Sequence, residues 1–381
     1  MSATGAGGPG KADRGPVGQG GRQPASGQPR AAVVGTGLIG GSIGLALRRL
    51  GWWVSGSDQD ASRASRALEI GAIDCVGMDD EAAVTFVAVP AGQVAGVARA
   101  VLSRQRGDQA VTDVAGVKQA IVSAVGHPRF VGGHPMAGSE QEGVDGADPD
   151  LFLGATWVLT PDEATSGQAY TQVLSVVRAL GANPVALPPH RHDQLVALVS
   201  HTPHLAAATL MNLAADVAAS DPSLPRLAAG GFRDMTRIAS GHPGIWPDVV
   251  AENKEAILDS LDRLSGALDK VRAIVAAGDR EGLLALLERA REGRVNLPVG
   301  APALGEATEV RVPVPDRPGA IAEVTTLLGS MGVNIFDLEI AHSSEGDRGV
   351  MVLVVDASTE GAVREALAQR GFRASFRRME Q

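Results

Sequence analysis

The sequence predicts an α/β protein made of three folding units: an open, mostly parallel sheet unit, an all-helical unit, and a small ferredoxin-like unit of order βαββαβ. Three observations lead to this prediction. Short apolar runs alternate with helical segments over residues 31–188. Between His192 and about Arg294 no strand pattern occurs, and apolar residues recur at helical spacing. A proline- and glycine-rich stretch then precedes a second alternation of strands and helices.

The composition limits the kinds of partner that we expect. The 381 residues are enough for two or three domains with separate cores. No apolar run reaches the roughly 18 residues that span a bilayer, so no membrane partner is expected. The formal net charge of −9 comes without a basic block, which argues against nucleic acid and favours small molecules. Cys75 is the only cysteine, so no internal disulfide is expected, which fits a cytoplasmic protein.

The predicted domain limits follow changes in composition. Residues 1–30 hold nine glycines and four prolines with almost nothing apolar, so we expect a disordered tail that lacks the apolar core of a signal peptide. The three units are expected at 31–188, 189–297 and 308–381. A linker is expected at 298–307, because its prolines and glycines interrupt both helix and strand.

The first unit opens with a βαβ pattern in "RAAVVGTGLIGGSIGLALRRLGWWVSGSD". An apolar run leads through a glycine turn into a helix, and a second apolar run ends at Asp58. Further short strands are expected at Thr85–Val89, Ala110–Asp113, Arg129–Gly133, Thr156–Thr160 and Pro184–Leu187. This alternation predicts an open sheet whose ligands bind beyond the carboxyl ends of the strands.

The helical unit contains an apolar seam with steps of 4-3-4-3-4, which is typical of paired helices. The seam consists of Ile257, Leu261, Leu264, Leu268, Val271 and Val275. One helical layer leaves such a stripe uncovered, so we expect the helices of two subunits to pack together in a homodimer. Packing within one chain is the alternative.

The third unit shows six segments in the order βαββαβ. Its expected strands are "EVRVPVPD", "VNIFDLEIAHS", "RGVMVLVVDA" and "FRASFRRM", and its expected helices are "PGAIAEVTTLLGSMG" and "TEGAVREALAQRG". The order is that of a ferredoxin-like fold.

A dinucleotide site is predicted where the first strand turns into the first helix. Gly35, Gly37 and Gly40 form a GxGxxG motif that permits a tight turn, the approach of a pyrophosphate and close helix packing. Asp58 follows Gly35 by 23 residues, at a position where a carboxylate binds ribose hydroxyls and repels a 2′-phosphate. We therefore expect a Rossmann-like domain, with NAD favoured as its cofactor over NADP or a flavin. A structural glycine turn is the alternative. The expected cofactor contacts are Gly35, Gly37, Leu38, Ile39, Gly40, Asp58, Val89, Pro90 and Asp113.

Two strand-end loops carry candidate chemistry beside that cofactor. In "FVGGHPMAGSE", His134 stands at a strand's carboxyl end, where a neutral imidazole is suited to take the proton of an alcohol that loses hydride. Ser139 and Glu140 follow and are expected to contact substrate, although a helix start capped by Ser139 is an equally simple account. A structural turn histidine is the alternative for His134.

Histidines cluster at the start of the helical unit. "VSHTPHLAAATL" places His201 and His204 on one helix face, and His190 and His192 lie just upstream. A metal site is the alternative that such a cluster suggests, but no cysteine or close carboxylate pair completes a ligand set, so no metal is expected. Contact with substrate or a satisfied core position are the remaining interpretations.

The segment "GGFRDMTRIASGHPGIWPD" supplies candidate anion contacts. Arg233 and Arg237 are one helical turn apart, so both can reach one carboxylate-bearing substrate. An exposed face with Asp234 as a local partner is the alternative. Trp246 is expected to wall the pocket, or else to be a core indole.

Taken together, "GTGLIGGSIGLAL", "TDVAGVK", "GGHPMAGSE", "SHTPH" and "GGFRDMTRIASGHPGIW" resemble the prephenate dehydrogenases of tyrosine biosynthesis over residues 31–297. The resemblance implies NAD-dependent oxidative decarboxylation of prephenate to 4-hydroxyphenylpyruvate. It also implies that His134 accepts the proton of the ring hydroxyl and that Arg237 binds a substrate carboxylate. The pocket is then lined by Ser139, Glu140, His204 and Trp246.

The third unit resembles an ACT domain, a small-ligand regulatory module, through "VPDRPGAIAEVTTLLGSMGVNI". The resemblance implies feedback by an aromatic amino acid, most plausibly L-tyrosine, held near Gly319 and Asn334. Such modules sometimes serve assembly alone.

One position departs from the family pattern. Gly116 stands where the family commonly has a serine near the catalytic histidine, so arogenate, or an amino analogue of prephenate, stays open as the substrate. A β-hydroxyacid dehydrogenase would need a catalytic lysine, for which Lys254 is the candidate. A non-enzymatic sensor of NAD and an ACT ligand is a further alternative.

Overall fold

The computed structural model describes residues 21–138, 141, 143–241, 243–295, 307–315, 317–342 and 348–378. The chain divides into two compact units, residues 1–269 and 270–381. The sheet unit and most of the helical unit therefore cluster together, and the division falls inside the long helix α11 (Lys254–Ala277). The predicted linker at 298–307 lies outside the described residues except for Ala307.

An eight-stranded sheet forms the centre of the first unit. Its order is β3-β2-β1-β4-β5-β6-β7-β8, and all neighbours are parallel except β6 and β7. The strands are β1 (Arg30–Val34), β2 (Trp53–Ser57), β3 (Cys75–Val76), β4 (Val84–Val87), β5 (Ala110–Asp113), β6 (Phe130–Pro135), β7 (Thr156–Thr160) and β8 (Asn183–Ala186). The strand order reverses direction between β1 and β4, which is where an open sheet of this type binds its ligand.

The predicted strands are confirmed, and most of their ends differ from the predicted ends by two residues or fewer. β5 and β7 have the predicted limits. β3 has only two residues and shows no period of its own, so the sequence did not indicate it. The antiparallel pairing of β7 with β6 is the exception to the mostly parallel sheet.

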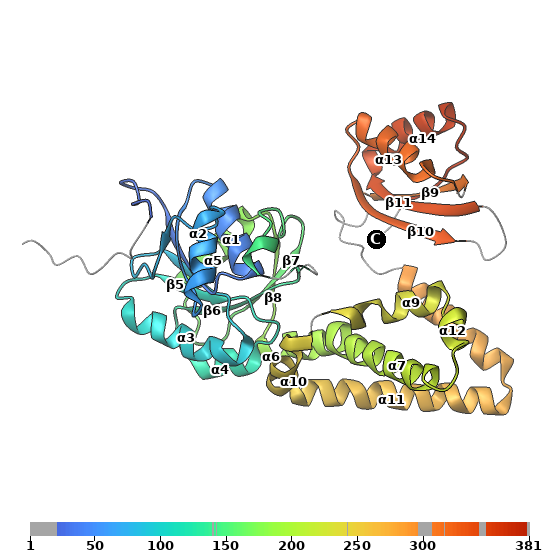
Figure 1. Ribbon diagram of the computed structural model, residues 1–381, viewed down its shortest axis with the longest axis horizontal. Coiled ribbons are helices and arrows are strands. Elements are labelled where there is room, and N and C mark those ends of the chain that lie inside the picture. The colour runs from blue at the N-terminus through green and yellow to red at the C-terminus, as the bar shows by residue number, and fades with distance from the viewer. Residues whose placement is uncertain are drawn as a thin grey trace, which may run out of the picture. The chain divides into compact units, whose positions relative to one another are not determined.

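Helices cover both faces of this sheet (Figure 1). They are α1 (Leu38–Arg49), α2 (Ala61–Glu69), α3 (Ala91–Arg104), α4 (Gln119–Val125) and α5 (Gly167–Ala179). One core cluster joins α1, α2 and α5 to one face, and a second joins α3 and α4 to the other. Burial on both faces explains why the strands read as continuous apolar runs.

Residues 21–29 differ from the predicted disordered tail. Gly21 forms a bridge with Cys75 at the edge of the sheet, and the Arg22 N–H donates to the Asp74 carbonyl at 2.8 Å. The Trp53 indole N–H in turn donates to the Arg22 carbonyl at 2.6 Å. Backbone pairing at a sheet edge needs no apolar side chains, so composition did not indicate it.

Helices alone occur in the described residues from 189 to 295, as predicted. They are α6 (Pro189–Val196), the π-helix η2 (Ala197–His201), α7 (Thr202–Ala218), α8 (Leu224–Leu227), α9 (Gly230–Thr236), η3 (Arg237–Ser240), η4 (Pro243–Ile245), α10 (Trp246–Glu252), α11 and α12 (Arg280–Val295). η2 joins α6 to α7 without a break in helical backbone. Among the described residues no helix is long and apolar enough to cross a membrane.

The predicted seam lies on α11, and only its first part is covered by the chain itself. Ile257 is buried, whereas Leu268 and Val275 are more than half exposed. Ser260, next to the seam, accepts a hydrogen bond from the Thr202 hydroxyl at 2.8 Å. Packing within the chain therefore accounts for the beginning of the seam and not for its end.

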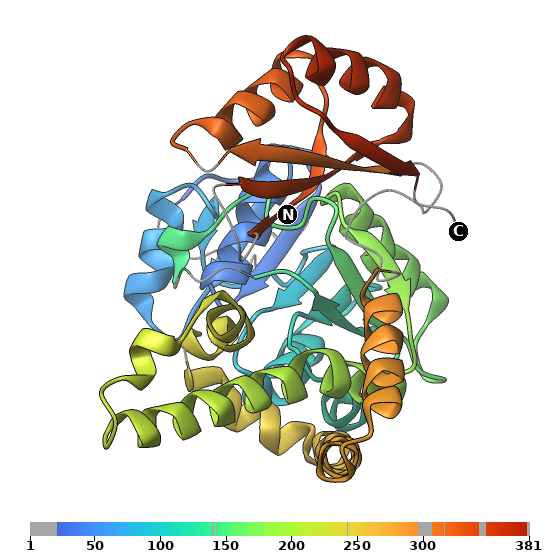
Figure 2. The same ribbon diagram turned by 90° about the vertical axis from the view of Figure 1, so that its right-hand side faces the viewer.

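The C-terminal unit has the predicted βαββαβ order. Its elements are β9 (Ala307–Pro315), α13 (Ala320–Ser330), β10 (Ile335–His342), β11 (Arg348–Asp356), the short η5 (Ala357–Thr359), α14 (Glu360–Gln369) and β12 (Ser375–Arg378). The antiparallel sheet has the order β10-β11-β9-β12. Both helices pack on one face of it, as Figure 2 shows in orange and red.

Candidate active site

The glycine turn between β1 and α1 is shaped for a dinucleotide. Gly35 has a φ of 94°, and a Cβ there would lie 2.2 Å from the Ala88 carbonyl oxygen. A Cβ on Gly40 would lie 1.9 Å from the Gly35 carbonyl oxygen, so the helix can approach the turn only with glycine. A Cβ on Gly37 would meet nothing within 4 Å. The turn thus leaves open space at its middle glycine, where a pyrophosphate approaches bare backbone.

Asp58 lies beside this turn, just past β2. One carboxylate oxygen accepts the Thr36 backbone N–H at 2.8 Å, which holds the side chain at the carboxyl ends of β1 and β2. This is where the ribose of a bound NAD is expected. Ile39 packs against the core, and Val89 and Pro90 follow β4 at the same edge.

Asp113, expected to contact the cofactor, has several partners within the protein. It is fully buried, and its carboxylate pairs with the fully buried Lys118 ammonium. Its oxygens also accept the backbone N–H groups of Gly133 and Ala115, each at 3.0 Å. The carboxylate has no exposed surface in this structure. It ties the β5 loop to β6 one residue before His134.

His134, near the end of β6, is held by a chain of two further side chains. Its Nδ1 lies 2.8 Å from His192 Nε2, and the rings meet edge to face. His192 Nδ1 lies 2.7 Å from Asp193 Oδ1. The Asp193 carboxylate also accepts the backbone N–H groups of Lys118 and Gln119, each at 2.8 Å. These hydrogen bonds hold α6 against the start of α4 next to His134.

The surroundings of His134 keep its imidazole neutral. Burial lowers the pKa of His134 well below the usual 6.5, and the nearby His192, Lys118 and His201 lower this pKa further. A neutral imidazole has one nitrogen free to accept a proton, which is what a general base near neutral pH requires.

The helical segments place three aromatic rings beside the hydrogen-bonded series His134–His192–Asp193. Asn253 donates from Nδ2 to the Asp193 carbonyl at 3.0 Å and to His201 Nδ1 at 3.3 Å. The Trp246 indole meets His201 edge to face at 5.9 Å and stacks on His204 at 3.9 Å. Burial lowers the pKa of His201 to about 4. His134, His201, His204 and Trp246 are thus linked through consecutive contacts.

Comparison with known proteins identifies the family. The model of the prephenate dehydrogenase nucleotide-binding domain matches residues 43–186, that of its dimerization domain matches 188–289, and that of the ACT domain matches 308–372. The prephenate dehydrogenase of Bacillus subtilis is 35% identical over 84% of this chain and 90% of its own length. The chain belongs to the prephenate dehydrogenase family.

Two solved structures of this family share the fold. The prephenate dehydrogenase of Aquifex aeolicus, in complex with hydroxyphenyl propionate and NAD+, is 28% identical with a TM-score of 0.67, covering 71% of this chain and 99% of that one. The arogenate dehydrogenase of Synechocystis is 31% identical with a TM-score of 0.64, covering 71% and 100%. The predicted Rossmann-like, helical and ACT architecture is confirmed.

Of the two arginines expected to bind substrate, Arg237 lies in a segment that packs near the aromatic rings. Arg237 opens η3, which packs against α7, and Gly241 at the end of η3 lies against the His204 ring. Arg233 and Arg237 are both exposed. The structure thus brings the segment of Arg237 to His204 and Trp246. Ser139 and Glu140 lie outside the described residues.

Gly116, the departure from the family pattern, lies against the catalytic candidate. A Cβ there would be 3.6 Å from His134 Nε2 and 3.7 Å from Cε1, which is ordinary contact. The loop after β5 therefore approaches the same nitrogen that faces away from His192. A larger residue fits the backbone there, so glycine is not imposed by the fold.

The predicted histidine cluster does not assemble as a metal site. His190 is exposed, and His192 is engaged by His134 and Asp193. In the part of the chain that the structure describes, no three His, Cys, Asp or Glu side chains converge on a point that would hold an ion. His192 was expected only as a member of this histidine cluster and Asp193 was not expected at the site, although the adjacent His-Asp pair was a usable signal.

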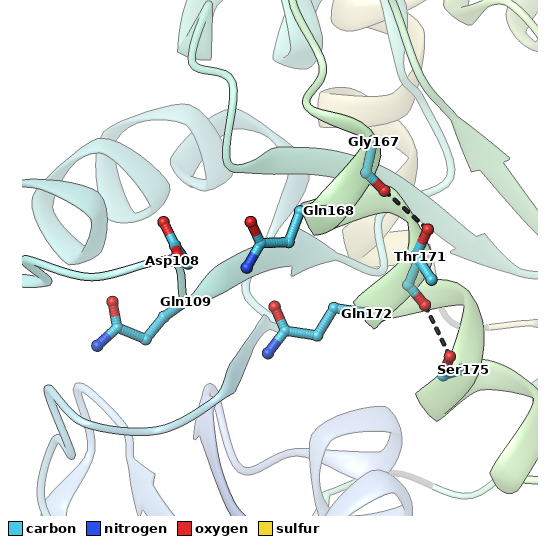
Figure 3. A pocket seen from close by; sticks show the side chains of 7 residues that line it. All are labelled: Asp108, Gln109, Gly167, Gln168, Thr171, Gln172 and Ser175. Atoms are coloured by element: carbon cyan, nitrogen blue, oxygen red, sulfur yellow. Dashed lines mark hydrogen bonds between the residues drawn. The ribbon is translucent and has the colours of Figure 1, made fainter.

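One surface hollow contains none of the candidate site residues. It lies along α5 and is lined by Asp108, Gln109, Gly167, Gln168, Thr171, Gln172 and Ser175 (Figure 3). The Thr171 and Ser175 hydroxyls there donate to helix carbonyls, each at 2.8 Å, and the other side chains are mostly amides. It lacks the histidines and arginines of the candidate site.

Proposed function

We propose that this protein is an NAD-dependent prephenate dehydrogenase that converts prephenate to 4-hydroxyphenylpyruvate and CO2. The observation that carries the proposal is His134, a neutral and partly buried candidate base at the carboxyl end of β6, at the edge that also holds the glycine turn and Asp58. Base and dinucleotide turn meet at one edge because β1, β2, β4, β5 and β6 run parallel.

The residues of the site match what this reaction requires. NAD, when bound, supplies the acceptor for the hydride that leaves the ring carbon. His134 Nε2 accepts the proton of the ring hydroxyl as that hydride leaves. The ring carboxylate then departs as CO2, and its bonding electrons make the ring aromatic. His134 returns its proton to the ring oxygen, so no proton is consumed or released overall.

Arg237 is the proposed partner of a substrate carboxylate, with Arg233 one turn before it. A guanidinium holds two carboxylate oxygens at once, which orients the substrate as well as attracting it. Trp246, stacked on His204, provides a flat apolar wall beside the ring of the substrate.

The decisive experiment follows NAD reduction at 340 nm with prephenate and arogenate offered separately. Turnover of prephenate is expected, and equal inactivity with both substrates would refute the proposed function. Arogenate remains the second candidate, because the Synechocystis arogenate dehydrogenase shares the fold and Gly116 removes the family hydroxyl. NADP offered in place of NAD is expected to react poorly because of Asp58.

Two substitutions separate the proposed roles. His134→Asn is expected to lower kcat by about 10²- to 10⁴-fold, with little change in KM, because it removes the base. Arg237→Ala is expected to raise KM by about 10- to 100-fold, the loss of a hydrogen-bonded ion pair. A His134→Asn enzyme of normal kcat would remove the base assignment.

The second proposal concerns assembly as a homodimer through the helical domain. The family model that matches this segment is that of a dimerization domain. Helices α7 and α11 also carry apolar side chains that remain exposed in the single chain. These include Met211, Leu213, Val217, Leu258 and Leu268. Sedimentation of the wild-type chain and of Leu213→Glu tests this, and a wild-type monomer at micromolar concentration would contradict it.

The third proposal is feedback by L-tyrosine at the ACT domain. Gly319 caps the start of α13 with a φ of 87°, and Asn334 follows the end of α13. The 11 residues of α13, which span about 16 Å, lie between these two positions. Unchanged rates up to millimolar tyrosine would remove the proposal.

A further inference from the structure

The candidate site contains two buried side chains to which no motif assigned a part in the reaction, His192 and Asp193 of α6. They extend inward from His134: Nδ1 of His134 lies 2.8 Å from His192 Nε2, and His192 Nδ1 lies 2.7 Å from Asp193 Oδ1. His192 is fully buried and Asp193 is 4% exposed. Such a chain costs free energy to bury unless each polar atom has a partner.

The positions of the protons follow from the carboxylate at the inner end. An ionised carboxylate only accepts hydrogen bonds, so His192 Nδ1 carries the proton that points to Asp193. In a neutral imidazole the other nitrogen is then an acceptor, so His192 Nε2 accepts from His134 Nδ1. His134 therefore carries its own proton on Nδ1, and its Nε2 keeps a free lone pair.

Asp193 is anchored and cannot turn away from this role. Its two carboxylate oxygens accept the backbone N–H groups of Lys118 and Gln119, each at 2.8 Å. Its own backbone carbonyl accepts from the Asn253 side chain at 3.0 Å. These bonds hold the carboxylate against the start of α4, and they hold the imidazole of His192 between two fixed partners.

We propose that His192 and Asp193 are positioning residues that present the unprotonated Nε2 of His134 to the substrate hydroxyl and stabilise the positive charge that His134 gains there. Identifying the hydroxyl as that of prephenate rests on the proposed function. The position of the proton on His134 is a property of the protein alone.

The charges around His134 show why such support is needed. The ionisable groups that face it are Lys118 at the start of α4, His201 of η2 and His192 of α6, and each disfavours a protonated His134 when it carries a positive charge itself. Asp113 of β5 is paired with Lys118. Asp193 is then the carboxylate that reaches His134 through a hydrogen-bonded group. A proton taken up at Nε2 is stabilised because the chain leads to that negative charge.

The proton balance is closed within the site. As hydride leaves the ring carbon, the hydroxyl O–H bond breaks and an N–H bond forms at His134 Nε2. When CO2 leaves, that N–H bond breaks and the phenol O–H bond forms. The chain to Asp193 keeps the His134 ring in place between these two transfers, so that it serves first as base and then as acid.

Three variants at two neighbouring positions test the proposal. His192→Phe keeps a ring but removes the acceptor for His134 Nδ1, and kcat for prephenate is expected to fall about 100-fold with KM within threefold. His192→Gln offers a carbonyl oxygen to the same N–H, and its kcat is expected to be about tenfold higher than that of His192→Phe. His190→Phe, on an exposed residue two positions earlier, is the matched control and is expected to retain wild-type kcat.

A spectroscopic measurement makes the test independent of turnover. In wild-type protein labelled with 15N-histidine, without substrate, His134 is expected to carry its proton on Nδ1 at neutral pH, and the His192→Phe variant is expected to lose this preference. NAD affinity within threefold of wild type shows that the variant is folded. A wild-type proton on Nε2, or a His192→Phe kcat within threefold of wild type, would overturn the proposal. Inactivity of the wild type with prephenate would refute the proposed function alone.

Discussion

The buried Lys118–Asp113 pair beneath His134 allows a prediction in which stability and catalysis are both measured. Both side chains are fully buried, and Lys118→Met keeps the apolar stem while removing the ammonium. The variant leaves the Asp113 carboxylate buried with only the Gly133 and Ala115 N–H groups as partners. Breaking a buried pair in this way typically costs about 3–5 kcal/mol. Because those two hydrogen bonds remain, we expect about 3 kcal/mol.

Denaturant unfolding, followed by the fluorescence of the buried Trp53 and Trp157, measures this loss. The double variant Lys118→Met/Asp113→Asn is expected to be more stable than Lys118→Met alone, because no uncompensated charge is left. Arg104→Met, which breaks an exposed pair with Asp80, is the control and is expected to cost less than about 1 kcal/mol. A Lys118→Met loss as small as that of the control would refute the reasoning.

The same variant changes the pH dependence of turnover. His134 must be neutral to act as base, so kcat rises with pH through the pKa of His134, which lies below 6.5 in the wild type. Lys118 lowers that pKa by repulsion, so Lys118→Met is expected to move the acidic limb to higher pH. Burial, the largest cause, persists, so the limb stays below 6.5. A limb that moves to lower pH would contradict the assigned electrostatics.

Three further predictions concern the cofactor turn and the loop over His134. Gly40→Ala places a Cβ 1.9 Å from the Gly35 carbonyl oxygen and is expected to lower the melting temperature and abolish NAD binding. Gly37→Ala is expected to keep the melting temperature and to weaken NAD binding, as measured by calorimetry. Asp58→Ser is expected to raise KM for NAD about tenfold and to improve use of NADP, and an unchanged ratio of the two would argue against ribose binding by Asp58. Gly116→Ser fits without a clash and is expected to change kcat less than about tenfold; loss of folding would contradict the space found there.

Much of the fold could be predicted because the relevant signals are local. The glycine turn, the apolar runs and the helical seam each lie within one continuous stretch, and all of the expected strands of the first unit form. The place of His134 at the sheet edge was also predictable, since the carboxyl ends of parallel strands share one edge. In each case the sequence neighbours of a residue determine its surroundings.

Other features depended on contacts between distant segments. Asp113 was expected to touch the cofactor, but its pairing with Lys118 and the Gly133 N–H buries it. Gly319 and Asn334 were expected to share a ligand, but a whole helix separates them. Neither outcome is visible from residue type or local spacing, because a side chain's partners depend on how the elements pack.

The sequence by itself determined the family, the order of the three folding units, the dinucleotide turn and the place of His134 at the sheet edge, because each of these is indicated by local motifs. Only the tertiary structure decided which side chains form hydrogen bonds on the inner side of His134. His134 and His192 are separated by 58 positions and lie in different units of the predicted fold, yet they meet at 2.8 Å. Asp193 completes the chain only because α6 docks on the start of α4. Such a contact depends on the packing of a helix against a sheet domain, which no local pattern encodes.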